Sequence, residues 1–213
     1  MRLRIFLAIA ILAAIGLSIG AALVETLPGD KAITTSFQNA DATWFETTMR
    51  TVTRFGGTVP MLGILALGAI ILSRRSHLQY ALGLPGLAIG LALVPFMKEF
   101  VDRPRPTVDL VSVLSNVGGQ SFPSGHAFMS ITVLGALFYL AGYICGPSKL
   151  AVYVLRTVLV LGILAIGASR VYLGVHWTSD IVGGYLIGGL LLFAAIHLFN
   201  TYMKPQTHSS LAM

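Results

Sequence analysis

The sequence is poor in charge. Of its 213 residues, 14 are Lys or Arg and 8 are Asp or Glu, so that only 10% of the chain is charged. A soluble domain carries about 25% charged residues, because its surface faces water. This shortage excludes an ordinary soluble protein, and the 55% of apolar residues exclude a disordered chain, which needs low hydrophobicity and high charge. A mean hydropathy of +0.83 indicates instead an integral membrane protein with little room for a soluble domain.

Cysteine is almost absent. Cys145 stands alone, which excludes an intramolecular disulfide and a zinc cluster built on cysteine. It lies at the end of an apolar run, where packing is the usual role of a free cysteine. Basic residues are in excess, with a net charge of +6, but they do not gather in one stripe of the sequence. Membrane topology therefore explains them better than a nucleic-acid partner, which we do not expect.

Apolar residues form six runs, each about as long as a helix that crosses a bilayer. We therefore predict an all-α fold in which residues 1–213 form a single membrane domain of six transmembrane helices. The first run follows Arg2 and Arg4 as a signal peptide would, but it is longer than the apolar region of most signal peptides, which favours an uncleaved anchor. The predicted spans are residues 5–24, 55–73, 78–97, 127–145, 150–168 and 181–199.

Basic residues in the short connections predict the orientation of the bundle. Cytoplasmic loops of membrane proteins carry an excess of Lys and Arg, and here every second connection is basic. We therefore predict a multi-pass protein of the cell (inner) membrane, with both termini in the cytoplasm and the opposite side extracytoplasmic. The basic residues on the predicted cytoplasmic side are Arg2, Arg4, Arg74, Arg75, Lys149 and Lys204.

Residues 32–54, between the first two runs, are polar but contain apolar side chains at roughly helical spacing. This pattern predicts an amphipathic helix on the outer membrane surface. A loop packed over the bundle accounts for it equally well, and both interpretations stay open. The apolar residues concerned are Phe37, Trp44, Phe45, Met49 and Val52.

Two polar segments, residues 98–126 and 169–180, fall at helix ends on the predicted outer side. Costly polar groups gathered at one membrane depth indicate a functional site. Several permanent cations near one point need an anion with several oxygen atoms, and Arg and Lys both suit phosphate. The segment that starts at Pro123 opens a helix, so its first N–H groups are free for an anion. Ser124 adds a hydroxyl, and Gly125 allows close approach. The candidate cations are Lys98, Arg105 and Arg170, with Arg103 nearby.

Two histidines add chemistry to this phosphate site. His176 and Asp180 lie one helical turn apart, so the carboxylate can hold one imidazole nitrogen and leave the other free to attack. His126 comes from another helix and can act as the general acid. The carboxylates nearby are too scattered for a pair of metal ions, so we expect neither metal nor other cofactor, and the cations would stabilise the transferring group. Taken singly, Lys98 can also snorkel and Asp180 can cap a helix; their joint placement favours a site.

The spacing of these residues resembles the three-part signature of the type 2 phosphatidic acid phosphatase family. The three parts are Lys98-x6-Arg105-Pro106, Pro123-Ser-Gly-His126 and Ser169-Arg170-x5-His176-x3-Asp180. The resemblance implies a metal-independent membrane lipid phosphatase that works through a phosphohistidine. It implies that His176 is the nucleophile, that Asp180 orients it, and that His126 protonates the leaving oxygen and then activates water. The residues that would hold the phosphoryl group are Lys98, Arg105, Ser124, Gly125 and Arg170.

Several questions stay open at this stage. Arg103 lies outside the strict signature, and contact with the phosphate or the lipid head group is as plausible for it as a structural role. The family implies a lipid phosphate or diphosphate in the outer leaflet as substrate, for example undecaprenyl diphosphate, phosphatidylglycerophosphate, phosphatidic acid or a lipid A phosphate. A phosphotransferase differs only in its acceptor, and a non-catalytic lipid-binding or transport protein would not need His176. No obligatory protein partner is expected.

Overall fold

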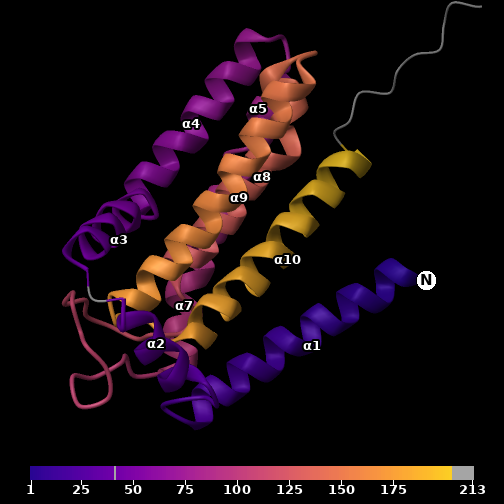
Figure 1. The fold of residues 1–213 in the computed structure, drawn as a ribbon. Helices are drawn as coiled ribbons and strands as arrows, with labels where there is room; N and C mark the ends of the chain where they lie inside the picture. Colours follow the sequence, from indigo (N-terminus) through magenta and orange to yellow (C-terminus); the bar gives the residue numbers. More distant parts are fainter. Residues whose placement is uncertain (41, 203–213) are drawn as a thin grey trace, which may run out of the picture.

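The structure is a computed structural model that describes residues 1–40 and 42–202, and all regular secondary structure within these residues is helical, as predicted (Figure 1). Lys204, one of the predicted cytoplasmic residues, lies outside the described part. The helices are α1 (Arg2–Leu23), α2 (Asp30–Gln38), α3 (Thr43–Phe55), α4 (Thr58–Arg74), α5 (Leu78–Gly83), α6 (Gly86–Ile89), the 3-10 turn η1 (Gly90–Ala92), α7 (Leu93–Val101), α8 (Gly125–Cys145), α9 (Lys149–Tyr172) and α10 (Thr178–Tyr202).

Four helices of the described chain are long and apolar enough to cross a membrane: α1, α8, α9 and α10. They coincide with the first, fourth, fifth and sixth predicted spans. The pair α3 and α4 makes a fifth candidate if it is counted as one span, although the pair bends by 59°. The chain is therefore a membrane protein whose described residues form helices and no strands, whereas the number of six spans stays a prediction.

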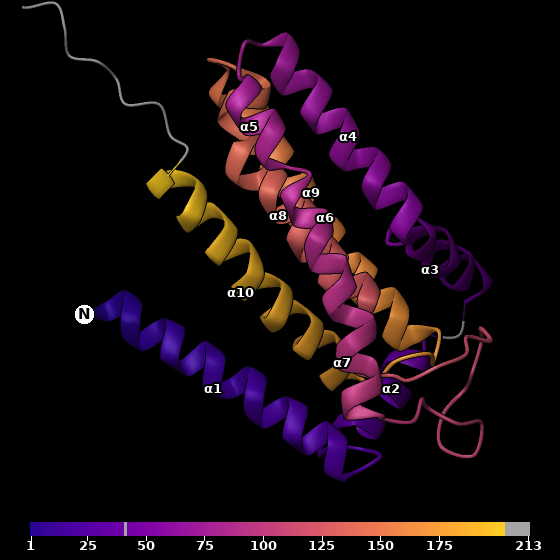
Figure 2. The ribbon, with the colours of Figure 1, turned by 180° about the vertical axis from the view of Figure 1, so that it is seen from behind.

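The third predicted span, residues 78–97, is helical but not one continuous helix. It consists of α5, α6, η1 and the start of α7, which follow one another along the bundle (Figure 2). Pro85 cannot donate a helical hydrogen bond, and glycine weakens a helix interior, so the pattern of apolar residues alone overestimates its continuity. Gly90 permits a close approach, because a side chain there would collide with Leu191 of α10.

The segment between α1 and α4 contains two helices, α2 and α3, which pack over one end of the bundle. Phe45 of α3 lies edge-on to Tyr172 of α9, with ring centroids 4.9 Å apart, and Phe37 of α2 approaches the same ring at 6.3 Å. Met49 is buried beside them, whereas Trp44 remains 71% exposed. The amphipathic pattern therefore forms two helices whose apolar side chains mostly pack on α9.

Helix α8 is the centre of the fold. About 56% of its apolar stretch is buried inside the protein, against 11% for α1. Both views place it among α4, α9 and α10, with α1 at the edge beside α10 (Figures 1 and 2). Gly184 and Gly188 let α10 lie directly on α8, since a Cβ at Gly184 would come within 2.7 Å of the Ser124 carbonyl oxygen. This close contact brings the first turns of α8 and α10 together.

Candidate active site

The residues singled out in the sequence meet at one end of the bundle. This is the end that carries α2, the long loop after α7, and the starts of α8 and α10 (Figure 2). The N-terminus of α1 and the visible end of α10 lie at the other end (Figures 1 and 2). His176 lies in the turn between α9 and α10, and Asp180 in the first turn of α10. Helix ends thus supply most of the side chains of the site, listed here by element: Lys98 of α7, Arg105 of the following loop, Ser124, Gly125 and His126 of α8, and Arg170 of α9.

His176 is buried and faces both a carboxylate and a cation. Its Nδ1 lies 3.4 Å from Oδ2 of Asp180, and its Nε2 lies 3.3 Å from Nη1 of Arg105. Only 2% of the residue is exposed. The sharp turn that places it depends on Gly174, whose φ of +66° favours glycine and where a side chain would collide with Ser112. One imidazole nitrogen therefore meets Asp180, and the other faces the basic residues.

Burial lowers the pKa of His176 to about 4. The Asp180 carboxylate opposes this shift, and the charges of Arg105 and Arg170 add to it. The imidazole is therefore neutral near pH 7, with a lone pair on one of its nitrogens. A neutral imidazole is the form that can act as a nucleophile.

Asp180 both caps its own helix and holds the imidazole. Its Oδ2 accepts a hydrogen bond from the Trp177 N–H at 2.8 Å and one from the Ser121 hydroxyl at 2.5 Å. Ser121 Oγ also lies 3.4 Å from His176 Nδ1. The helix-cap interpretation and the orienting role are therefore compatible at this residue. Sequence reasoning assigned no role to Ser121, although it stands only three residues before Ser124.

The three cations of the signature are held by neutral oxygen atoms. Lys98 donates to the carbonyl oxygens of residues 120 and 121, and Arg105 to those of residues 118, 119 and 175. Arg170 is 5% exposed; its Nη1 donates to Thr53 Oγ1 at 2.8 Å, and its buried Nε has no partner. Within the described residues, none of the three belongs to an ion pair. Their positive charge is therefore available to an anion.

The start of α8 supplies the opposite wall. Ser124 is fully buried, and its hydroxyl accepts a hydrogen bond from the Ala127 N–H at 3.4 Å as the N-cap of the helix. His126 bonds to the backbone of Thr53 and lies close enough to His176 and the two arginines for electrostatic interaction. Gly56 borders the ring, because a Cβ there would come within 2.9 Å of His126 Cδ2. Helix α3 therefore helps to place both His126 and Arg170, a contribution that sequence reasoning missed.

Arg103 differs from the other cations in having two carboxylates as partners. It is 1% exposed and donates from Nη1 to Asp180 Oδ1 at 2.6 Å and from Nη2 to Asp30 Oδ2 at 2.8 Å. Its Nε donates to the Glu25 carbonyl oxygen at 3.1 Å. Since all three guanidinium nitrogens have protein partners, this geometry favours a structural role behind Asp180 over contact with a phosphate or a head group. Asp30 had no sequence signal, because it lies far from every motif.

An apolar cleft of about 450 Å³ lies between the α3–α4 bend and α9. It comes near His126, because Ile166, one of its lining residues, and His126 both lie against Gly56. The cleft has no charged residue among those that line it. These are Val52, Phe55, Met61, Ile64, Leu134, Val158, Leu159, Leu161, Gly162, Ala165 and Ile166.

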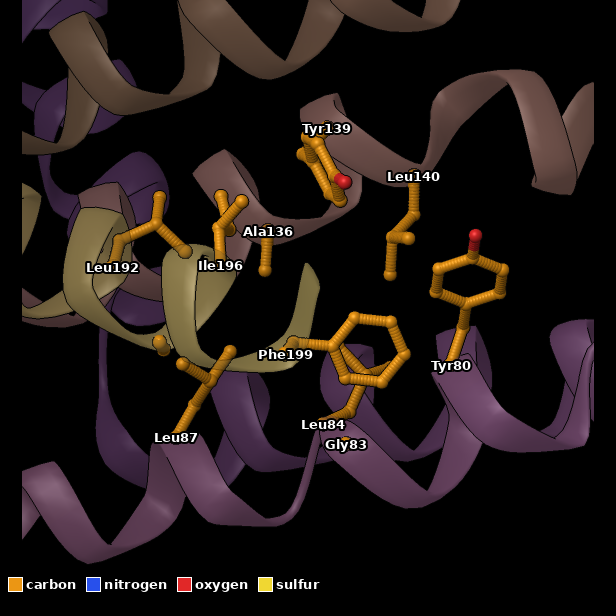
Figure 3. Close-up of a pocket in the computed structure, with 11 residues that line it drawn as sticks. Tyr80, Gly83, Leu84, Leu87, Ala136, Tyr139, Leu140, Leu192, Ile196 and Phe199 are labelled. Carbon is orange, nitrogen blue, oxygen red and sulfur yellow. The ribbon is translucent and has the colours of Figure 1, made fainter. Parts of the chain in front are cut away.

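A second apolar pocket lies at the opposite end of the bundle, among α5, α8 and α10 (Figure 3). Its volume is about 50 Å³, and its only polar lining groups are the hydroxyls of Tyr80 and Tyr139. The Tyr80 hydroxyl lies 2.8 Å from that of Tyr143. No charged side chain lines this pocket, so it offers no chemistry comparable to that around His176.

Comparisons with known proteins identify the family and the relatives of this chain. A sequence model of the PAP2 superfamily matches residues 79–204. Phosphatidylglycerophosphatase B of Bacillus subtilis is 29% identical over 179 residues, which are 82% of this chain and 85% of that protein. Decaprenylphosphoryl-5-phosphoribose phosphatase of Mycobacterium tuberculosis is 31% identical over 171 residues, or 78% and 89% of the two chains. A crystal structure of a transmembrane PAP2-type phosphatidylglycerolphosphate phosphatase from Bacillus subtilis has the same fold, with a TM-score of 0.80 at 24% identity, over 94% of this chain and 98% of that one.

Proposed function

The chain belongs to the PAP2 superfamily and is a membrane lipid phosphatase, and from this we propose that it cleaves a phosphomonoester or diphosphate of a membrane lipid through a phosphohistidine on His176. The observation that carries the proposal is the placement of His176 between Asp180 at 3.4 Å and Arg105 at 3.3 Å. The donor set around it is cationic, and its one carboxylate already accepts several hydrogen bonds. Such a set suits an oxyanion better than a metal ion.

The first step forms a bond from His176 Nε2 to phosphorus. Lys98, Arg105 and Arg170, with the N–H groups at the start of α8, bind the phosphoryl oxygens and stabilise the charge on them. An arriving phosphoryl group gives Arg105 an anionic acceptor in place of the imidazole. The negative charge of the bound substrate favours the protonated form of His126; the bond from phosphorus to the lipid oxygen breaks, and His126 gives its proton to that oxygen. Asp180 stabilises the positive charge that develops on the imidazole.

The second step returns the enzyme to its starting state. His126, now neutral, accepts a proton from a water molecule whose oxygen attacks phosphorus. The bond between phosphorus and Nε2 breaks, phosphate leaves, and His176 is again neutral. A phosphotransferase would use the same intermediate with a second lipid as acceptor, so release of one phosphate per lipid consumed distinguishes hydrolysis from transfer.

The mechanism is tested by His176→Ala in purified, folded protein. We expect no phosphate release from this variant and no labelled phosphoenzyme, whereas the wild type gives a phosphoenzyme that is labile in acid and stable in alkali. His197→Ala, a change at the far end of α10, serves as the matched control and keeps full activity. Undiminished phosphate release from His176→Ala would contradict both the mechanism and the choice of site, whereas a lipid-binding or transport protein would tolerate the change.

The apolar cleft beside His126 is the proposed place of the hydrocarbon chain of the lipid. Its apolar lining and its closeness to His126, which lies against the same glycine as the lining residue Ile166, support this assignment, because a chain there leaves the phosphate near His126. Gly162→Leu places a large side chain in the cleft and is expected to lower kcat/KM for a long-chain lipid phosphate at least tenfold. Hydrolysis of a water-soluble phosphate monoester should not change. Gly63→Leu, on an open face of α4, is the control; equal losses on both substrates would contradict the assignment.

The proposed orientation puts this site on the extracytoplasmic face of the inner membrane, with six spans and both termini in the cytoplasm. Basic residues at the other ends of the spans support it. Single cysteines introduced at residues 109 and 148 of a Cys145→Ala protein provide the test in intact cells. An impermeant thiol reagent should label the first and not the second. Among substrates, phosphatidylglycerophosphate and decaprenylphosphoryl-5-phosphoribose, for which the two named relatives are named, come first in a phosphate-release panel.

A further inference from the structure

We propose that Asp30 and Arg103 are positioning residues of the reaction: their buried ion pair fixes the Asp180 carboxylate and keeps its negative charge available to His176. The inference rests on the proposed function, since it assigns a task in the phosphoryl transfer by His176. Neither residue belongs to the motifs found in the sequence. Both are buried, with 3% of Asp30 and 1% of Arg103 exposed.

The carboxylate of Asp180 is held at both oxygen atoms. Oδ2 faces His176 and accepts hydrogen bonds from the Trp177 N–H and the Ser121 hydroxyl. Oδ1 points to the other side, where Arg103 Nη1 donates to it at 2.6 Å. Without Arg103, the carboxylate is held at Oδ2 alone, by the Trp177 N–H and the Ser121 hydroxyl, and is placed less firmly against the imidazole. Arg103 thus holds the group that in turn holds the nucleophile.

Arg103 is itself fixed by the segment between α1 and α2. Asp30, the first residue of α2, accepts from Arg103 Nη2 at 2.8 Å. It also accepts from the N–H of Ser179 at 2.9 Å and from the Ser179 hydroxyl at 2.7 Å, so that it binds the first turn of α10 directly. The Ser179 hydroxyl accepts in turn from Arg103 Nη1 at 2.8 Å. Asp30, Arg103 and Ser179 therefore form one closed network around the back of Asp180.

Charge gives Asp30 a role beyond geometry. The charged groups that act on His176 are Asp180, Arg105 and Arg170, so two cations face the imidazole against one anion. Arg103 alone would cancel the charge of Asp180. With Asp30 present, the set of Asp30, Arg103 and Asp180 carries one net negative charge. That charge favours the positive imidazole that forms when Nε2 bonds to phosphorus.

A purely structural ion pair would give a different result from a charge-setting one. Buried ion pairs often contribute little net stability but become costly when one partner is removed. If the pair only fastens the loop to α10, removing both charges can be no better for catalysis than removing one. If the pair sets the charge at His176, a variant that lacks both charges again leaves one net negative charge on Asp180 and regains activity.

The experiment compares Asp30→Asn with Asp30→Asn/Arg103→Met in the full-length protein, using a long-chain lipid phosphate. We expect Asp30→Asn to lower kcat about 10-fold or more while KM changes by less than about threefold, because one pKa unit of lost interaction corresponds to a factor of 10. The labelled phosphoenzyme should form more slowly by the same factor. The double variant should recover at least about a third of the loss in log kcat that Asp30→Asn causes. Glu46→Gln, which removes a carboxylate from a surface ion pair with Arg50, is the matched control and should behave as the wild type.

Two results would overturn the inference: wild-type kcat in Asp30→Asn, or a double variant no more active than Asp30→Asn. Thermal melting in detergent shows whether each variant folds. If Asp30→Asn does not fold, Ser179→Ala takes its place, since it keeps every charge and removes the bridging hydroxyl; a kcat lowered about threefold at unchanged KM supports the inference, and an unchanged kcat overturns it. His176→Ala distinguishes a failure of the positioning role from a failure of the proposed function. If it is inactive while Asp30→Asn equals the wild type, only the positioning role fails; if it is active, the proposed function fails.

Discussion

Arg103 and Arg105 are separated by one proline and face opposite sides of the same carboxylate–imidazole pair. Behind Asp180, Arg103 is enclosed by two carboxylates, and its side chain is fully buried. In front of His176, Arg105 is held by backbone carbonyl oxygens and belongs to no ion pair among the described residues. Compensated charge therefore lies on the side that supports the nucleophile, and uncompensated charge lies on the side that would meet the phosphate.

The difference teaches that the partner of a cation, more than its place in a motif, decides what it can do. A guanidinium that already donates to carboxylates has little to offer a phosphate, and its loss leaves buried anions without a counterion. A guanidinium that donates to carbonyl groups keeps its charge for an incoming oxyanion. Substitution of Arg103 is therefore expected to lower mainly the stability, and substitution of Arg105 mainly the activity.

The largest effect is expected from Arg103→Met. This change leaves Asp30 and Asp180 buried without their shared counterion, and we expect a loss of about 3–5 kcal/mol in the free energy of unfolding. Thermal melting in detergent measures it, because the variant should melt well below the wild type. Arg50→Met breaks an exposed ion pair on α3 and should cost less than about 1 kcal/mol. Equal melting temperatures for Arg103→Met and Arg50→Met would contradict the structural role of Arg103 behind Asp180.

Arg105→Met should give the reverse pattern. Loss of one preorganised donor to a transferring group lowers the rate by about 100- to 1,000-fold, whereas the melting temperature should stay near that of the wild type. Arg105→Lys keeps the charge but loses the planar fork, so we expect it to recover only part of the rate. Steady-state kinetics with a lipid phosphate give the answer. A folded Arg105→Met protein with full activity would remove Arg105 from the phosphate site.

The smallest expected effect is the pH dependence of protein stability that His176 causes. The pKa of His176 is lowered from its usual 6.5 to about 4, so the unfolded chain binds more protons than the folded one between these values. The contribution of His176 to stability is therefore fully present above pH 6.5 and is lost as the pH falls toward 4. Melting curves at pH 7 and pH 5 should differ less in His176→Gln than in the wild type. Nitrogen NMR of labelled histidines should show a neutral His176 at pH 5, and a charged imidazole at that pH would contradict the assignment.

The sequence supplied the part of this site that is built from short-range spacing. His176 and Asp180 are one helical turn apart, and the start of α8 is marked by Pro123, so their mutual geometry follows from local structure. Long apolar runs likewise predicted α1, α8, α9 and α10. The interruptions in the helix over residues 78–97 were not predicted. A hydropathy pattern records which residues are apolar, and it does not register that Pro85 cannot donate a helical hydrogen bond.

Contacts between segments that are distant in the chain could not be predicted from the sequence. The two partners of Arg103 lie 73 residues before it and 77 after it, and nothing in the spacing of Asp30 distinguishes it from a residue at an ordinary helix start. The same holds for Thr53, which reaches Arg170 across 117 residues. Arg103 and Arg105 look alike in the sequence because only their partners differ, and those partners come from segments far along the chain.

In the proposed arrangement of six spans, the short helix α4 also sets how deep the site lies. Helix α4 has 17 residues, and at 1.5 Å per residue it rises about 26 Å, less than the hydrocarbon thickness of about 30 Å. A short span draws the two surfaces of the bilayer toward each other where it crosses. Because Gly56 precedes α4 and lies against His126, the thinned membrane would lie beside His126 and His176. A lipid phosphate diffusing in its own leaflet would then reach the nucleophile at head-group level, and its acyl chains would stay in hydrocarbon, where each CH₂ group moved into water costs about 0.8 kcal/mol.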